Sequence, residues 1–112
     1  MQRQREAEEQ KAKGNDYMKS KEFTIAMGHY TQAINIDPTH AATYANRAQA
    51  YIKMKQFSNA VEDADNAIKL DPKYVKGYFR RAKANEGQEK FELALKDYKP
   101  VSYTHLTLPT KA

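Results

Sequence analysis

Apolar and aromatic positions recur along this chain at one constant interval. Bulky rings stand at Phe23, Phe57 and Phe91, and an alanine follows three residues after each, at Ala26, Ala60 and Ala94. Between these positions the apolar residues follow helical spacing. A period of about 34 residues is typical of a helix-turn-helix repeat, in which no unit buries its apolar face alone and neighbouring units stack. We therefore predict an all-α repeat solenoid.

The same pattern predicts six helices, at residues 4–19, 24–36, 41–54, 58–70, 75–87 and 91–99. Asp37-Pro38 and Asp71-Pro72 end the first two units, because proline cannot continue a helix and biases the preceding residue away from helical angles. The small residues at equivalent positions, which let paired helices approach closely, are Gly14, Ala48 and Ala82. We expect repeats at residues 7–40 and 41–74, and an incomplete one at 75–99.

The end of the chain departs from the repeat. Pro100 follows Lys99, and a proline costs about 3 kcal/mol inside a helix, so we expect the sixth helix to stop there. Residues 100–112 carry no repeat positions, and the string 101–110 resembles the translation of a sequencing-library adapter. We expect this tail to be non-native or disordered, the natural gene to continue past Lys99, and an apolar face to lie uncovered at this end.

Composition narrows the class of protein. With 40% hydrophobic and 29% charged residues, the chain is typical of a globular domain, and no apolar run approaches the roughly 18 residues of a membrane span. The absence of cysteine excludes disulfides and fits a cytoplasmic or also nuclear setting. The net charge of +5 favours acidic partners. Because lysines are interspersed with acids, we expect neither a membrane nor a nucleic-acid partner. We also expect a monomer.

Five polar side chains are distributed over the first helices of the three predicted pairs. They are Lys11 and Asn15 in the first repeat, Asn46 in the second, and Lys76 and Arg80 in the third. Residues four apart share a helix face, which applies to Lys11 with Asn15 and to Lys76 with Arg80. Because the first helices of stacked pairs line the concave side of such a solenoid, we expect these three cations and two amides to converge.

This combination suits a compact dianion. Lysine is a mobile point charge, arginine can hold a carboxylate with two parallel hydrogen bonds, and asparagine donates without adding charge. A peptide that ends in aspartate offers two carboxylates on one residue. Lys53 lies seven residues after Asn46, two turns along the same helix face, and can meet an acidic side chain further up such a peptide.

The repeat positions resemble the tetratricopeptide repeat over about residues 7–99. The shared marks are a bulky aromatic, a small residue, a tyrosine, an alanine, a second aromatic, a second alanine and a proline at fixed offsets. The departures are Gln10, Ala64 and Asn85, each of which replaces a bulky or aromatic residue. The resemblance implies a right-handed superhelical arrangement of the helix pairs.

The polar cluster is similar to the dicarboxylate clamp of chaperone-binding tetratricopeptide domains, with all five positions matching in residue type and repeat offset. The resemblance implies that the cluster holds the C-terminal Glu-Glu-Val-Asp tail of heat-shock chaperones, the 90-kilodalton class first and the 70-kilodalton class second. Within this family, residues 15–23 and 73–82 resemble the N-terminal domain of type-5 serine/threonine protein phosphatases. That likeness implies a targeting and autoinhibitory role for a phosphatase domain absent from this chain.

Other functions have weaker support. His29, His40 and His105 are isolated, and the glycines form no phosphate-binding loop, so we expect no enzyme activity, metal or cofactor in this chain. We interpret Asp63 and Asp65 as exposed helix charges. Two alternatives stay open: a stand-alone co-chaperone or adaptor, and a basic scaffold for RNA or an assembly, whose cations would meet phosphates.

Overall fold

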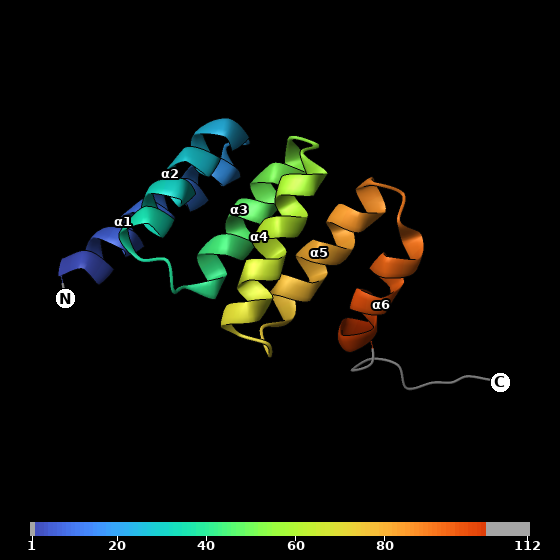
Figure 1. The fold of residues 1–112 in the computed structure, drawn as a ribbon. Helices are drawn as coiled ribbons and strands as arrows, with labels where there is room; N and C mark the ends of the chain where they lie inside the picture. The colour runs from blue at the N-terminus through green and yellow to red at the C-terminus, as the bar shows by residue number, and fades with distance from the viewer. Residues whose placement is uncertain (1, 103–112) are drawn as a thin grey trace.

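The computed structural model describes residues 2–102, with side chains described up to Tyr98. The elements in that range are α1 (Gln2–Lys19), α2 (Phe23–Ile36), α3 (Ala41–Lys53), α4 (Phe57–Leu70), α5 (Val75–Gly87) and α6 (Phe91–Ser102) (Figure 1). The prediction of an all-α repeat is confirmed for these residues. Residues 103–112, most of the tail expected to be non-native, lie outside the described residues.

The last helix is longer than predicted. α6 continues through Pro100 to Ser102, so the expected stop after Lys99 is wrong. The reason is that proline has a helix-compatible φ, and its missing N–H costs this helix a single backbone hydrogen bond. On this helix Phe91 and Leu95 are exposed, at 61% and 65%, so apolar surface is open at this end of the stack.

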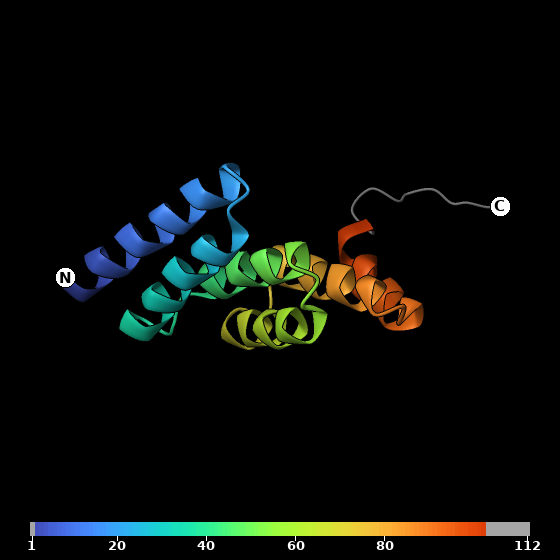
Figure 2. The ribbon, with the colours of Figure 1, turned by 90° about the horizontal axis from the view of Figure 1, so that it is seen from above.

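The helices form three pairs, α1–α2, α3–α4 and α5–α6, which follow one another along a molecule of 54 × 29 × 22 Å (Figure 2). Consecutive pairs contact each other through α2–α3 and α4–α5. In addition α3 contacts both α1 and α5, whereas within the described residues α2, α4 and α6 do not pack on one another. The first helices of the pairs therefore make a continuous layer. We call the surface formed by α1, α3 and α5 the inner face.

The same tight turn joins the two helices of each pair. Lys21, Lys55 and Glu89 occupy the same position of successive repeats and adopt φ angles of 63°, 61° and 62°. After each of them, a backbone N–H reaches the carbonyl five residues earlier, for example from Glu22 to Tyr17 at 2.8 Å. This Schellman-type ending satisfies carbonyls that a helix terminus leaves open. The sequence period is therefore also a period of backbone geometry.

The interior of the pairs is built largely from small side chains, which allow close helix packing. The fully buried alanines are Ala26, Ala45, Ala48, Ala50, Ala60, Ala64, Ala67, Ala82 and Ala84. Tyr30 is the one large side chain among the described residues that is fully buried. It fits because it faces Gly14, where an added Cβ would lie 2.6 Å from the tyrosine ring. The equivalent positions of the second repeat hold two alanines, Ala48 and Ala64. In the first repeat, the larger Tyr30 side chain fills the volume that Gly14, which has no side chain, leaves empty.

Two arginines at equivalent positions of the second and third repeats each connect three helices. Arg47 on α3 donates to both carboxylate oxygens of Asp63 on α4, at 2.8 Å, and to the Thr31 hydroxyl on α2 at 3.0 Å. Arg81 on α5 repeats the arrangement with Asp97 on α6, at 2.7 and 2.8 Å, and with Asp65 on α4 at 2.8 Å. Each guanidinium therefore joins the second helix of its own pair to the second helix of the preceding pair.

The interpretation of Asp63 as an exposed helix charge is wrong. Its side chain is 3% exposed and is paired with Arg47, whereas that of Asp65 is 44% exposed. Residues two apart point to different sides of a helix, which is why neighbouring aspartates differ so much. The hydrogen-bonded Asp63 carboxylate raises the pKa of Arg47, against the opposing effect of burial. The guanidinium therefore stays charged.

We predict that Asp63→Ala lowers the free energy of unfolding by about 3–5 kcal/mol, because it leaves the buried Arg47 guanidinium without its carboxylate. Asp65→Ala is the matched control, with an expected loss of about 0–1 kcal/mol, because that carboxylate is more exposed and Arg81 keeps Asp97. Urea unfolding followed by circular dichroism measures both. Equal losses in the two variants would contradict the importance of the buried pair.

A second prediction concerns the contact between α1 and the Tyr30 ring. Gly14→Ala should destabilise the fold by about 1–3 kcal/mol through overpacking, even though alanine favours helices. In Gly28→Ala the added Cβ meets nothing within 4 Å, so this control should gain up to about 1 kcal/mol. Thermal unfolding compares the two. A stabilised Gly14→Ala variant would show that the ring moves aside without cost.

Candidate functional site

Two of the predicted site residues meet at the inner face. Asn15 on α1 and Asn46 on α3 come from different repeats, and the Asn46 Nδ2 donates to Asn15 Oδ1 at 3.3 Å. The same oxygen accepts a hydrogen bond of 2.5 Å from the Tyr30 hydroxyl, which reaches it from α2. Because Asn15 Oδ1 already accepts twice, the Asn15 Nδ2 group is left to donate to something else.

Arg80 approaches this network from α5. One of its terminal nitrogens donates to Gln49 Oε1 on α3 at 3.3 Å, and Gln49 lies one turn after Asn46. Its Nε is buried and has no hydrogen-bond partner among the described residues. Burial lowers the pKa of Arg80, while Tyr74 and Tyr30 act in the opposite direction. The guanidinium is therefore partly desolvated without being neutralised.

Arg80 differs in this respect from the two other arginines of the central helices. Arg47 and Arg81 each grip an aspartate with two hydrogen bonds. Arg80 has no carboxylate partner within the described part of the chain. Burying a charge without a counter-charge costs free energy of desolvation. A hydrogen bond from this guanidinium to an anion would therefore be stronger than the same hydrogen bond formed in water. Arg80 thus has hydrogen-bonding capacity that the described residues leave unmet.

The three lysines lie at the edge of this network. Lys11, one turn before Asn15, is largely buried at 19% exposure, and its Nζ lies 3.2 Å from Glu8 Oε2. Lys76, one turn before Arg80, and Lys53, two turns after Asn46, are exposed. The structure gives neither of these two a hydrogen bond or an ion pair among the described residues. They can reorient toward a ligand because nothing in that range holds them.

Two residues of the network were missed by the sequence analysis. Gln49 stands one repeat period after Asn15, so the repeat offset itself could have placed it on the inner face. The Tyr30 ring is buried and packs in the core, and no sequence signal shows where its hydroxyl points. The structure therefore joins Asn15 to Asn46 and Tyr30, and Arg80 to Gln49.

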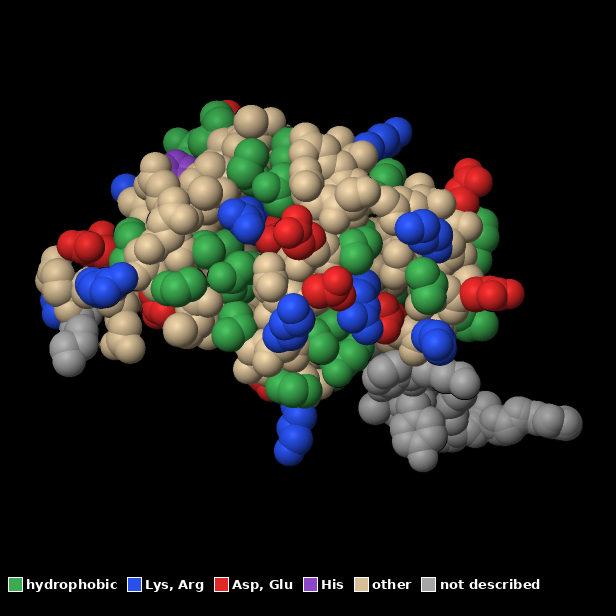
Figure 3. Space-filling view, in the orientation of Figure 1, with side chains coloured by type: hydrophobic (Ala, Val, Ile, Leu, Met, Phe, Trp, Pro, Cys, Tyr) green, Lys and Arg blue, Asp and Glu red, His purple; other side chains and the backbone are tan. Residues whose placement is uncertain are grey.

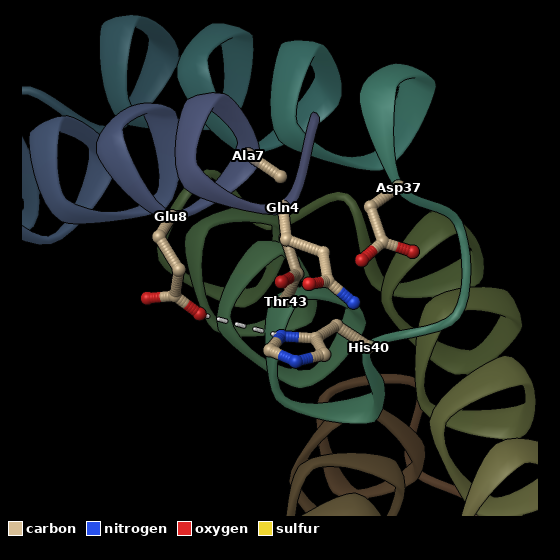
Figure 4. Close-up of a pocket in the computed structure, with 6 residues that line it drawn as sticks. All are labelled: Gln4, Ala7, Glu8, Asp37, His40 and Thr43. Atoms are coloured by element: carbon tan, nitrogen blue, oxygen red, sulfur yellow. Dashed lines mark ion pairs between the residues drawn. The ribbon is translucent and has the colours of Figure 1, made fainter. Parts of the chain in front are cut away.

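A pocket of about 280 Å³ lies next to this site, between the first half of α1, the α2–α3 loop and the start of α3 (Figure 4). Its lining includes the carboxylates of Glu8 and Asp37 and the imidazole of His40. The Glu8 carboxylate that pairs with Lys11 also lies 3.6 Å from His40 Nδ1. With two carboxylates on its wall, this pocket does not favour an anion. Within the described residues no group of three or more potential metal ligands is present.

Basic and acidic side chains are interleaved on the face drawn in Figure 3, where α2 and α4 lie toward the viewer. That face therefore offers no broad surface of one charge, despite the net charge of +5. None of the helices that the structure describes is long and apolar enough to cross a membrane. The inner face carries amide groups and a partly buried guanidinium with exposed ammonium groups beside them, and this combination of donors can bind an anion.

Comparison with known proteins agrees with the repeat. The family model "Tetratricopeptide repeat" matches residues 41–74, and a second, "TPR repeat", matches residues 14–55. The chain is 48% identical over 42 residues to stress-induced-phosphoprotein 1 of Caenorhabditis elegans, covering 38% of this chain and 13% of that protein. It is 46% identical over 44 residues to human serine/threonine-protein phosphatase 5, covering 39% and 9%. The chain thus spans a small part of the curated relatives it matches.

Solved structures resemble nearly the whole chain. The TPR domain of Arabidopsis OM64 has a TM-score of 0.88 and 33% identity, covering 90% of this chain and 84% of that one. The first TPR domain of Spaghetti (RPAP3), bound to the HSP90 peptide SRMEEVD, has a TM-score of 0.86 and 36% identity, covering 88% and 79%. Repeat period, helix pairing and these likenesses agree: the chain belongs to the tetratricopeptide repeat family.

Proposed function

We propose that this chain is a peptide-binding module that captures the acidic C-terminal Glu-Glu-Val-Asp tail of heat-shock chaperones, the 90-kilodalton class first and the 70-kilodalton class second. The carboxylate-binding residues are Lys11, Asn15, Asn46, Lys76 and Arg80, with Lys53 as an auxiliary contact. The observation that carries the proposal is Arg80, whose buried Nε has no partner among the described residues and whose guanidinium has no carboxylate there either.

The chemistry of the terminal aspartate suits the inner face. Its two carboxylates need several donors from different directions, which Asn15, Asn46 and Arg80 supply from three helices. The exposed ammonium groups of Lys76 and Lys53 add charge that can follow the peptide. Charge-assisted hydrogen bonds of this kind are stronger than neutral ones. Because the Asn15 and Asn46 amides and the Arg80 guanidinium are each held by a hydrogen bond, the peptide end meets groups that are already positioned.

The comparisons support this assignment by analogy. Tetratricopeptide repeats are protein-interaction modules, and the solved RPAP3 domain carries an HSP90 peptide that ends in Glu-Val-Asp.

At the level of the whole protein, we propose that this chain is the targeting and autoinhibitory domain of a type-5-like serine/threonine phosphatase in the cytoplasm, or also the nucleus. A stand-alone co-chaperone or adaptor is the second candidate, favoured by the likeness to stress-induced-phosphoprotein 1. The gene sequence beyond Lys99 separates the two.

We predict that the free-acid peptide Glu-Glu-Val-Asp binds at least about tenfold more tightly than its C-terminal amide, roughly the value of one charge-assisted hydrogen bond. The affinity should also fall as salt rises, because exposed lysines are screened. Isothermal titration calorimetry at two salt concentrations measures both effects. Equal affinities for the acid and the amide would contradict the proposed carboxylate clamp.

We predict that Arg80→Ala weakens binding of the free-acid peptide by about 30-fold or more, since losing one partner of a desolvated charge pair typically costs about 2–5 kcal/mol. Arg80→Lys should recover only part of the affinity, because lysine keeps the charge but lacks the planar fork. The matched control is Lys69→Ala on α4, which removes one positive charge outside the inner face. If Lys69→Ala weakens binding as much as Arg80→Ala, the peptide is held by net charge alone and the carboxylate clamp is wrong.

A further inference from the structure

We infer that Tyr30 is a positioning residue of the peptide site, whose hydroxyl holds the Asn15 amide with its NH₂ group turned toward the ligand. This inference rests on the function proposed above and concerns the same site. Tyr30 does not touch the peptide in this scheme, because its side chain is fully buried between α1 and α2. It acts through one hydrogen bond, from its hydroxyl to Asn15 Oδ1.

The first argument is the direction of that hydrogen bond. A side-chain amide has an acceptor end and a donor end, and only the donor end can bind a carboxylate. Asn15 Oδ1 accepts from Tyr30 on one side and from Asn46 Nδ2 on the other. With its oxygen held twice, the amide cannot turn over without losing both bonds. The donor end of Asn15 is therefore available before any peptide arrives, which lowers the entropic cost of binding.

The second argument is the cavity that admits the ring. An added Cβ on Gly14 would lie between 2.6 and 3.0 Å from three atoms of the Tyr30 ring, so only a glycine lets the ring pass this close beneath α1. Gly14 immediately precedes Asn15 in the sequence. The same close approach that packs the ring therefore brings its hydroxyl to the neighbouring amide.

The third argument comes from the other repeats, whose equivalent positions hold different residues. The second repeat has Ala64 at the position of Tyr30 and Gln49 at that of Asn15, so no tyrosine stands where it could hold the amide. The third repeat has Tyr98 and Lys83, and the Tyr98 hydroxyl contacts Glu86 on the next turn of α5. A tyrosine paired with an asparagine thus occurs in the first repeat, where the two predicted asparagines meet.

The ionisation of Tyr30 agrees with a donor role. Burial raises the pKa of the phenol to about 12, and the nearby positive charge of Arg80 opposes this only in part. A phenol keeps its proton at neutral pH even at the ordinary tyrosine pKa, and the raised pKa leaves the Tyr30 hydroxyl a donor at higher pH as well.

The test removes only the hydroxyl. Tyr30→Phe in the full chain should weaken binding of the free-acid Glu-Glu-Val-Asp peptide by roughly three- to tenfold, the range that one hydrogen bond supports. Binding of the amidated peptide should change much less, so that the ratio of the two affinities falls. Tyr44→Phe is the matched control, because the Tyr44 hydroxyl donates to the Pro38 carbonyl and not to the site. Calorimetry measures affinity, and circular dichroism checks that each variant is folded.

A double-mutant cycle separates positioning from general packing. In an Asn15→Ala background Tyr30→Phe should have almost no further effect on affinity, because the residue through which the hydroxyl acts is gone. Equal, additive losses in both backgrounds overturn the inference, as does a loss of the same size in Tyr44→Phe. A wild-type chain that prefers the free acid while Tyr30→Phe binds normally overturns this inference alone. A wild-type chain that binds acid and amide equally overturns the proposed function with it.

Discussion

The register between consecutive helix pairs depends on two arginine side chains, each of which connects its own helix to two others through hydrogen bonds. Arg47 and Arg81 reach forward to an aspartate in their own pair and backward to a polar group in the preceding pair. Both guanidinium groups are partly buried, so removing the aspartate of either pair would leave an uncompensated buried charge and destabilise the fold. The alanine-rich interfaces bring the helices close but offer few large side chains to set their relative position. The paired charges supply directional contacts that apolar packing lacks.

The candidate site exists only because this register is kept. Asn15, Asn46 and Arg80 belong to three different helices, and the hydrogen bonds between α1 and α3 and between α3 and α5 span two pair boundaries. The neighbouring arginines Arg80 and Arg81 then have opposite roles on one helix. Arg81 is ion-paired with Asp97 and Asp65. Arg80 instead faces the Gln49 amide and two phenols, so its hydrogen-bonding capacity is not used up. One arginine stabilises the stack, and the next is available to an anion.

Packing and recognition are also linked through Tyr30. Its ring fills the space left by Gly14, and its hydroxyl ends at the Asn15 amide. A single side chain thus belongs to the core of the first pair and to the network beneath the inner face. Such a link makes the position of the amide depend on the packing of α1 against α2 rather than on a loop, and sites built on rigid elements hold their geometry better.

Much of this protein followed from the sequence alone. The constant repeat period, with helical spacing inside it, indicated paired helices, and the turns repeat with that period because Lys21, Lys55 and Glu89 adopt one backbone conformation. Pro100 does not end α6, since its φ is compatible with a helix and it removes only one backbone hydrogen bond. The repeat offset also placed Asn46 and Arg80 at equivalent positions of the first helices, where stacked repeats share a face, and Asn15 lies about one turn further along the first helix of its own repeat.

Only the tertiary structure decided which polar groups are partnered. Asp63 and Asp65 read alike in sequence, yet one is buried against Arg47 and the other half exposed, because pairing depends on the neighbouring helix. The same holds for Arg80 and Arg81, and for the Tyr30 hydroxyl, which reaches Asn15 through space opened by a glycine on another helix. Period and composition determine helices and faces because these are local properties of the chain. Burial and hydrogen-bond partners depend on how distant helices meet, so they are settled only when the pairs stack.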